Sequence, residues 1–150
     1  MTTVACDGKS VAADQRVSWD DNAGFRSPKV FRIGGSIFGL RGDNYANVFL
    51  EWAKSGFRSE LKPVFPDPVA EVDFTVIELA EDGMHMWDHM LVRVPILDKN
   101  YAIGSGHKVA LYAMRVLKLA PGAAVHEASK IDPFTDDNVD EIFLTEKAKV

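Results

Sequence analysis

The sequence predicts an α+β domain in which helices pack on β-sheets. Two short hairpin patterns open the chain, further strand patterns occupy its middle, and two helical patterns follow each other near its end. Strands and helices that come in groups, and do not alternate one by one, are typical of α+β layers. The length of 150 residues and the hydrophobic fraction of 47% fit one domain with its own core.

The first hairpin begins at the second residue of the chain. Residues 2–5 and 10–13 have strand composition, and Asp7-Gly8 between them is a turn signal. Terminal residues usually fray unless something fixes them. A strand that starts at Thr2 therefore indicates either that the terminus is held in place or that this is a plain edge strand.

The second hairpin leads into a helix. Residues 29–33 and 36–40 flank the turn signal Gly34-Gly35. Asp43 or Asn44 can then cap a helix that ends near Gly56.

The rest of the chain alternates loops, strands and helices. Three prolines predict that residues 57–69 form a loop. The remaining expected elements are strands at 72–79, 84–90 with a continuation at 91–94, and 101–104, helices at 107–119 and 121–131, and a last strand at 139–144.

Charge and cysteine content exclude several functions. The formal net charge is -5 and the basic residues are scattered, whereas a nucleic-acid binder needs clustered Lys and Arg. No apolar run approaches the length of a membrane span. A single cysteine, Cys6, cannot form an internal disulfide, and the chain starts without a basic and apolar leader, so a cytoplasmic protein is expected.

Five short motifs, in order along the chain, carry a resemblance to a known family. They are residues 2–4 (Thr-Thr-Val), 12–16 (Ala-Ala-Asp-Gln-Arg), 27–30 (Ser-Pro-Lys-Val), 38–42 (Phe-Gly-Leu-Arg-Gly) and 102–106 (Ala-Ile-Gly-Ser-Gly). The sequence resembles the proteasome β-subunit and HslV peptidase family of N-terminal nucleophile hydrolases over residues 2–144. The resemblance implies one domain over residues 1–150 with a four-layer αββα sandwich.

The resemblance also implies a catalytic centre at the start of the chain. Thr2 becomes the nucleophile once Met1 is removed, and its own α-amine, with a free pKa of about 7.7–8.0, serves as the base. The positive charge of Lys29 disfavours protonation of that amine, and Asp14 holds Lys29 charged and oriented.

Three further positions match supporting residues of the family. Gly42 matches the glycine whose backbone N–H stabilises the oxyanion. Ser105 and Asp132 match the residues that bind the amino terminus and position the nucleophile. Each candidate also has a structural explanation: Asp14 and Lys29 as a surface ion pair, Gly42 as a turn, Ser105 as a helix cap and Asp132 as part of a helix stop.

The resemblance also implies a substrate pocket. Five residues fall at or near positions that line the specificity pocket in the family, and their mostly apolar character favours a hydrophobic side chain before the scissile bond: Val17, Ser27, Phe31, Leu40 and Asn44. Phe31 and Leu40 are equally explained as core residues.

No metal or other cofactor is expected. Two histidines and a carboxylate, His85, His89 and Asp88, are residue types that bind zinc. Their segment is predicted to be strand or turn, however, and no further ligand has an evident place. Cys6 is expected to be a strand residue and not a nucleophile.

The chain departs from the family between Gly56 and Asp73, where members usually carry a second long helix. The first helical layer is therefore expected to be reduced, which leaves open whether an ATPase unfoldase docks there. The expected function is a threonine endopeptidase that acts on peptides or unfolded protein in a homo-oligomeric ring. A catalytically inactive structural or assembly subunit is the alternative, although a scaffold has no need for all four of Thr2, Asp14, Lys29 and Gly42.

Overall fold

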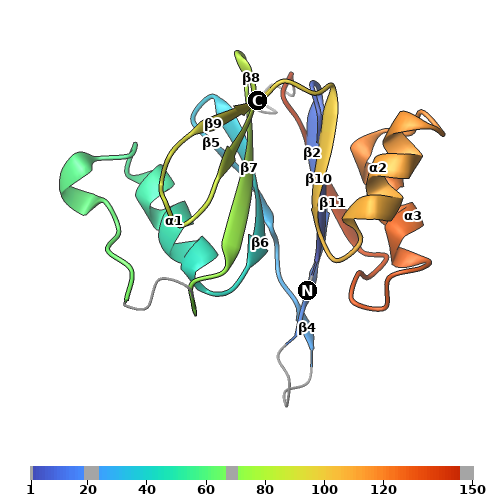
Figure 1. Cartoon of the computed structure of the whole chain (residues 1–150), viewed down its shortest axis with the longest axis horizontal. Coiled ribbons are helices and arrows are strands. Elements are labelled where there is room, and N and C mark those ends of the chain that lie inside the picture. The colour runs from blue at the N-terminus through green and yellow to red at the C-terminus, as the bar shows by residue number, and fades with distance from the viewer. Residues whose placement is uncertain (1, 19–23, 67–70, 146–150) are drawn as a thin grey trace, which may run out of the picture.

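The fold is a sandwich of two antiparallel sheets with helices on both outer faces (Figure 1). It is seen in a computed structural model that describes residues 2–18, 24–66 and 71–145. The layers run helix, sheet, sheet, helix, so the predicted αββα arrangement is confirmed.

The first sheet places the start of the chain in its interior. Its strands are β1 (Thr3–Asp7), β2 (Ser10–Asp14), β10 (Asn100–Gly104) and β11 (Val139–Phe143), in the order β10-β1-β2-β11. Thr3 pairs with Gly104 on one side, and Val4 pairs with Ala13 on the other. The plain edge-strand explanation is therefore wrong, because β1 is bonded along both edges.

The second sheet follows chain order. It contains β5 (Val30–Ile33), β6 (Ser36–Gly42), β7 (Phe74–Ala80), β8 (Gly83–Trp87) and β9 (Val94–Ile96). The strand predicted to reach residue 90 ends at Trp87, because Asp88 starts a turn: its carboxylate accepts a hydrogen bond from Met90 N, and its carbonyl accepts one from Leu91 N. A two-stranded hairpin, β3 (Arg16–Val17) with β4 (Phe25–Arg26), was not predicted from the polar composition around it.

Helices cover the two sheets unequally. Two helices, α2 (His107–Arg115) and α3 (Pro121–Ser129), pack on the first sheet, and α2 stops short of the predicted residue 119 before Lys118 adopts a positive φ of 59°. On the second sheet lies α1 (Tyr45–Lys54), followed by one turn of 3₁₀ helix, η1 (Ser59–Leu61). Between α1 and β7 the described residues contain no second long helix, as the sequence predicted. None of the described helices is long and apolar enough to cross a membrane.

Three apolar clusters hold the layers together. One lies between the sheets around Val4, Val11 and Ile77. The cluster under α2 and α3 consists mainly of alanines, so both helices lie close to the first sheet. The third cluster, under α1, is rich in aromatic side chains.

Two residues with positive φ complete the aromatic cluster where a second helix is missing. Phe57, with φ 59°, stacks on Trp87 with a ring separation of 5.1 Å and an interplanar angle of 3°. Leu91, with φ 57°, is 8% exposed and packs into the same cluster. Loop side chains thus cover part of this cluster.

Candidate active site

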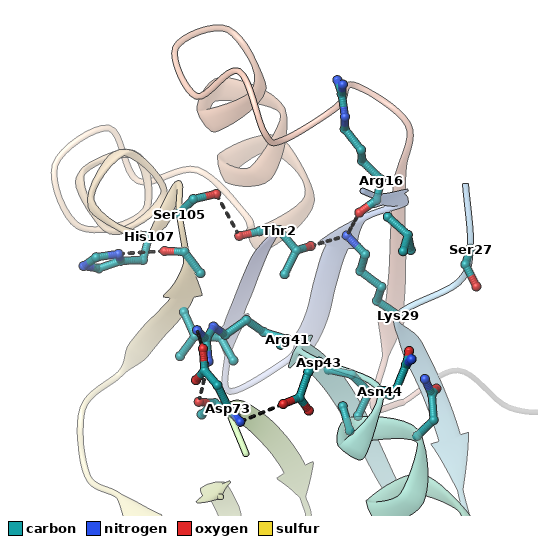
Figure 2. A pocket seen from close by; sticks show the side chains of 18 of the residues that line it. Thr2, Arg16, Ser27, Lys29, Arg41, Asp43, Asn44, Asp73, Ser105 and His107 are labelled. Carbon is teal, nitrogen blue, oxygen red and sulfur yellow. Dashed lines mark hydrogen bonds and ion pairs between the residues drawn. The ribbon is translucent and has the colours of Figure 1, made fainter. Parts of the chain in front are cut away.

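The candidate site lies at one end of the sandwich, where Thr2 enters β1. A pocket of about 740 Å³ opens there, and both sheets contribute to its lining. Figure 2 shows Thr2 with Lys29 and Arg16 on one side and Ser105 on the other, and Arg41, Asp43 and Asp73 across the pocket. The residues that the sequence suggested for catalysis therefore come from separate segments to one place.

Thr2 is held by its hydroxyl. The residue is buried, its Oγ donates a hydrogen bond to Asp14 Oδ1, and Lys29 Nζ lies 2.5 Å from the same Oγ and donates to it. A hydroxyl with one acceptor and one donor on either side has a fixed direction for its proton and its lone pairs. Thr2 is therefore a candidate hydroxyl nucleophile.

Asp14 is a fully buried carboxylate at the end of β2. Besides Thr2, its Oδ1 accepts a hydrogen bond from Thr3 N at 2.9 Å, and its Oδ2 accepts bonds from Arg16 N at 3.2 Å and Asp136 N at 3.3 Å. Main-chain donors on three segments therefore support the charge, which a buried carboxylate requires. The explanation of Asp14 and Lys29 as a surface ion pair is wrong, because both residues are buried.

Lys29 directly precedes β5 and uses all three of its N–H donors. Their acceptors are Thr2 Oγ, Asp14 Oδ1 at 3.4 Å and the carbonyl of Arg16. Burial lowers the pKa of Lys29 below the ordinary lysine value, while the charge and hydrogen bond of Asp14 oppose that shift. A protonated Lys29 satisfies every partner in this geometry.

Ser105 holds the main chain of Thr2. Its N–H donates to the Thr2 carbonyl at 2.8 Å, and its hydroxyl lies 3.3 Å from that carbonyl and 2.5 Å from Asp132 Oδ2. Gly104 permits this approach, because a Cβ there would lie 1.9 Å from the Thr2 carbonyl oxygen.

Asp132 lies behind Ser105 and shares its carboxylate with Thr135. Burial raises the pKa of Asp132, but the hydrogen bonds from Ser105 and Thr135 outweigh that effect and hold the pKa below its ordinary value. Thr135 donates to Asp132 Oδ2 at 2.6 Å, and its hydroxyl lies 2.7 Å from that of Thr3. The sequence analysis missed Thr135, although its place three residues after Asp132 was a usable signal.

Gly42 ends β6 beside the pocket with a φ of 118°. A Cβ at this position would lie 2.2 Å from the carbonyl oxygen of Asp73 and 2.5 Å from Phe74 Cα. Only glycine tolerates this conformation and this close approach. Gly42 therefore has a structural requirement here in addition to its predicted role.

Four of the five predicted substrate-binding residues line the pocket. They are Val17, Ser27, Leu40 and Asn44. Phe31 is not part of the lining and packs instead against the aromatic cluster under α1, so the core explanation applies to it. The pocket is more polar than predicted, since its wall also includes Arg41, Asp43, Asn47, Asp73 and Thr75.

The other candidates of the sequence do not form a second centre. Burial raises the pKa of the Cys6 thiol, and Asp7 adds to the shift, so this cysteine is unreactive at neutral pH. His85 is buried on β8, and Asp82 Oδ2 lies 3.7 Å from its Nε2. Across the described part of the chain, no group of three or more His, Cys, Asp or Glu is arranged to hold a metal ion.

Solved structures with the same architecture were found by structural comparison. The Thiobacillus denitrificans BPH structure in complex with epoxomicin aligns with a TM-score of 0.70 and 17% identity, over 94% of this chain and 97% of that chain. Eukaryotic HslV from Trypanosoma brucei aligns with a TM-score of 0.63 and 20% identity, over 95% and 97%. This chain has a proteasome-like fold.

A third solved structure shares this fold at lower sequence identity. The Gly-1 mutant of Anbu from Hyphomicrobium sp. strain MC1 aligns with a TM-score of 0.69 and 11% identity, over 95% of this chain and 81% of that chain. No protein-family model matches the sequence, and no curated protein sequence matches it significantly. The likeness is thus one of three-dimensional structure, and the arguments for chemistry come from the site itself.

Proposed function

We propose that the protein is a threonine peptidase whose mature form begins at Thr2. The observation that carries the proposal is the hydroxyl of Thr2, bonded on one side to buried Asp14 and on the other to buried Lys29, at the wall of a large pocket. Removal of Met1 exposes the α-amine of Thr2. A small residue in second position permits that removal.

In the proposed mechanism the Thr2 hydroxyl attacks a peptide carbonyl. The α-amine takes the hydroxyl proton, the backbone N–H of Gly42 stabilises the oxyanion, and the amine returns the proton to the leaving peptide nitrogen. An ester between Thr2 and the substrate remains. Water activated by the same amine then hydrolyses the ester and releases Thr2.

The charged neighbours support each step. Lys29 donates to Thr2 Oγ, so its positive charge favours the alkoxide that develops during attack, and it disfavours protonation of the nearby amine. Ser105, whose hydroxyl is bonded to Asp132, holds the main chain of Thr2, so the amine stays close to the hydroxyl that it must deprotonate.

We further infer that the active form is a homo-oligomeric ring that admits peptides or unfolded protein. The support is the resemblance of the sequence to the proteasome and HslV family, together with large apolar side chains that are exposed at the end of α2. Tyr112 is 56% exposed, Val116 57% and Leu117 50%, and all three lie at the end of α2 or just after it.

The decisive test combines mass and activity. Intact mass spectrometry of active protein should show a chain that begins at Thr2. Hydrolysis of a fluorogenic peptide that ends in a large apolar residue should be abolished by Thr2→Ala and by Lys29→Ala, and it should survive in part in Thr2→Ser, which keeps a hydroxyl. Active protein that retains Met1, or undiminished turnover in Thr2→Ala, would contradict a Thr2 nucleophile. Folded wild-type protein that cleaves no peptide would favour the structural or assembly subunit instead.

A further inference from the structure

The neighbours of Gly42 form a second hydrogen-bonded group, and they have no role in the mechanism proposed above. Behind Gly42 lies the main chain of Asp73, so close that no Cβ fits between them. Asp73 directly precedes β7, in the segment where the second helix of the resembling family is missing. The position of Gly42 therefore depends on where Asp73 is held.

Both sequence neighbours of Gly42 are bonded to Asp73. On one side, Asp43 N donates to the Asp73 carbonyl at 2.8 Å, and Asp73 N donates to Asp43 Oδ2 at 2.8 Å. On the other side, the Arg41 guanidinium donates to Asp73 Oδ1 at 2.9 Å and Oδ2 at 3.1 Å. Figure 2 shows Asp73 between Arg41 and Asp43, with dashed lines to both.

The ion pair has a second consequence, which is electrostatic. Two carboxylates, Asp43 and Asp73, flank the place where the proposed oxyanion forms, and a bare negative charge there would oppose the reaction. Arg41 balances Asp73 through a paired, fork-like contact, which is the strong geometry for these two groups. Both oxygens of Asp43 accept main-chain N–H bonds, from Tyr45 and from Asp73.

Protonation does not weaken this pair near neutral pH. The hydrogen bonds from Arg41 hold the pKa of Asp73 below its ordinary value, although partial burial works against the shift. The side chain of Arg41 is 27% exposed and that of Asp73 is 71% exposed, so the contact faces the pocket and is not part of the core. Its contribution to overall stability is accordingly small.

We propose that Asp73, clamped by Arg41, is a positioning residue that fixes the backbone of Gly42 for oxyanion stabilisation. The inference rests on the proposed function, since it assigns Asp73 and Arg41 a part in the same reaction. Neither residue touches the reacting atoms. They act by holding Gly42 between two fixed neighbours and by pairing the negative charge of Asp73 with Arg41.

Steady-state kinetics of Asp73→Asn, Arg41→Gln and the double variant test the proposal. Misplacing a catalytic group by about 1 Å costs on the order of 100-fold in rate, so each single variant should lose about 10- to 100-fold in kcat while KM changes less than about twofold. The double variant should lose no more than the worse single variant, because both changes release the same backbone. Asp73→Glu, which keeps the charge, should recover part of kcat.

A matched control separates positioning from general loss of an ion pair. Glu51→Gln removes the exposed pair with Lys54 on α1, at 3.1 Å, and should leave kcat unchanged. Thermal melting should agree within a few degrees among all variants. Values of kcat within twofold of the wild type for both Asp73→Asn and Arg41→Gln, or losses that merely follow the folded fraction, would overturn the proposal.

A structural measurement tests the same clamp without relying on turnover. The amide resonance of Gly42 and its hydrogen-exchange rate should change in Asp73→Asn and Arg41→Gln and stay constant in Glu51→Gln. If wild-type protein cleaves no peptide but the Gly42 amide responds in this way, the proposed function fails and the clamp stands. If wild-type protein is active and Gly42 does not respond, the clamp fails alone.

Discussion

At the level of single residues, burial of the Asp14–Lys29 ion pair costs free energy. Both side chains leave water almost completely, and the desolvation of two charges commonly exceeds the attraction between them. A fold gains little stability from such a pair compared with apolar residues of similar size. Because the pair encloses the Thr2 hydroxyl, the proposed chemistry explains its placement better than stability does.

The lowered pKa of Lys29 predicts the alkaline limit of activity. A lysine with a depressed pKa loses its proton at lower pH than a free lysine, whose pKa is about 10.4. If the reaction needs charged Lys29, kcat/KM should rise with pH as the α-amine of Thr2 loses its proton. At higher pH it should fall again as Lys29 loses its proton, with the midpoint of the fall below about pH 10.4. A pH profile of peptide hydrolysis measures both limbs.

Circular dichroism at each pH provides the control for that profile. The protein should remain folded through the alkaline fall in activity. A constant rate up to the pH at which the protein unfolds would contradict a role for the charge on Lys29.

Some contacts of single residues in the site could be predicted from the sequence, and others could not. Thr2, Asp14, Lys29 and Ser105 meet in space as the ordered motifs suggested, since each motif ends or begins a strand at the same end of the sandwich. The contact between Thr3 and Thr135 was not predictable, because it joins hydroxyls 132 residues apart with no pattern between them.

At the level of elements, loop side chains complete the aromatic cluster under α1. Leu91 and Phe57 reach this cluster only with backbone angles that cost non-glycine residues free energy. Their burial must offset that cost. The loops that carry them are therefore as much part of the core as the strands are.

Leu91→Ala tests this element. Truncation of a buried leucine leaves a cavity and costs about 2–5 kcal/mol, so the free energy of unfolding in urea should fall by that amount. Met90→Ala is the matched control, because Met90 is 65% exposed in the same turn and should change stability by less than about 0.5 kcal/mol. Equal effects of the two substitutions would show that the turn does not anchor the cluster.

Strand and helix boundaries separate what local pattern determines from what packing determines. The long strands and three helices follow hydrophobic spacing and were predicted. The break after Trp87 depends on the Asp88 turn, and the β3–β4 hairpin depends on pairing between two strands of two residues each. Neither leaves a periodic signal in the sequence.

For the molecule as a whole, the exposed apolar side chains at the end of α2 predict an assembly surface. Val116→Glu places a charge there and should shift the native mass toward smaller species, because burial of an unpaired charge in an interface is costly. Lys9→Glu alters the exposed turn between β1 and β2 and is the control.

Native mass spectrometry of both variants gives the answer. Intact oligomers in Lys9→Glu and smaller species in Val116→Glu are expected. An unchanged oligomer in Val116→Glu, or a monomeric wild-type protein, would contradict assembly through this surface.

The single thiol of the chain lies between the two sheets and is therefore a probe of how often the sheets separate. Cys6 has no exposed surface, so a thiol reagent reaches it only when the sandwich separates. Under native conditions with excess reagent, the labelling rate reports how often the sheets part. Cys6 takes no part in the proposed catalysis, but its labelling rate can therefore measure how often the scaffold that holds Thr2 opens.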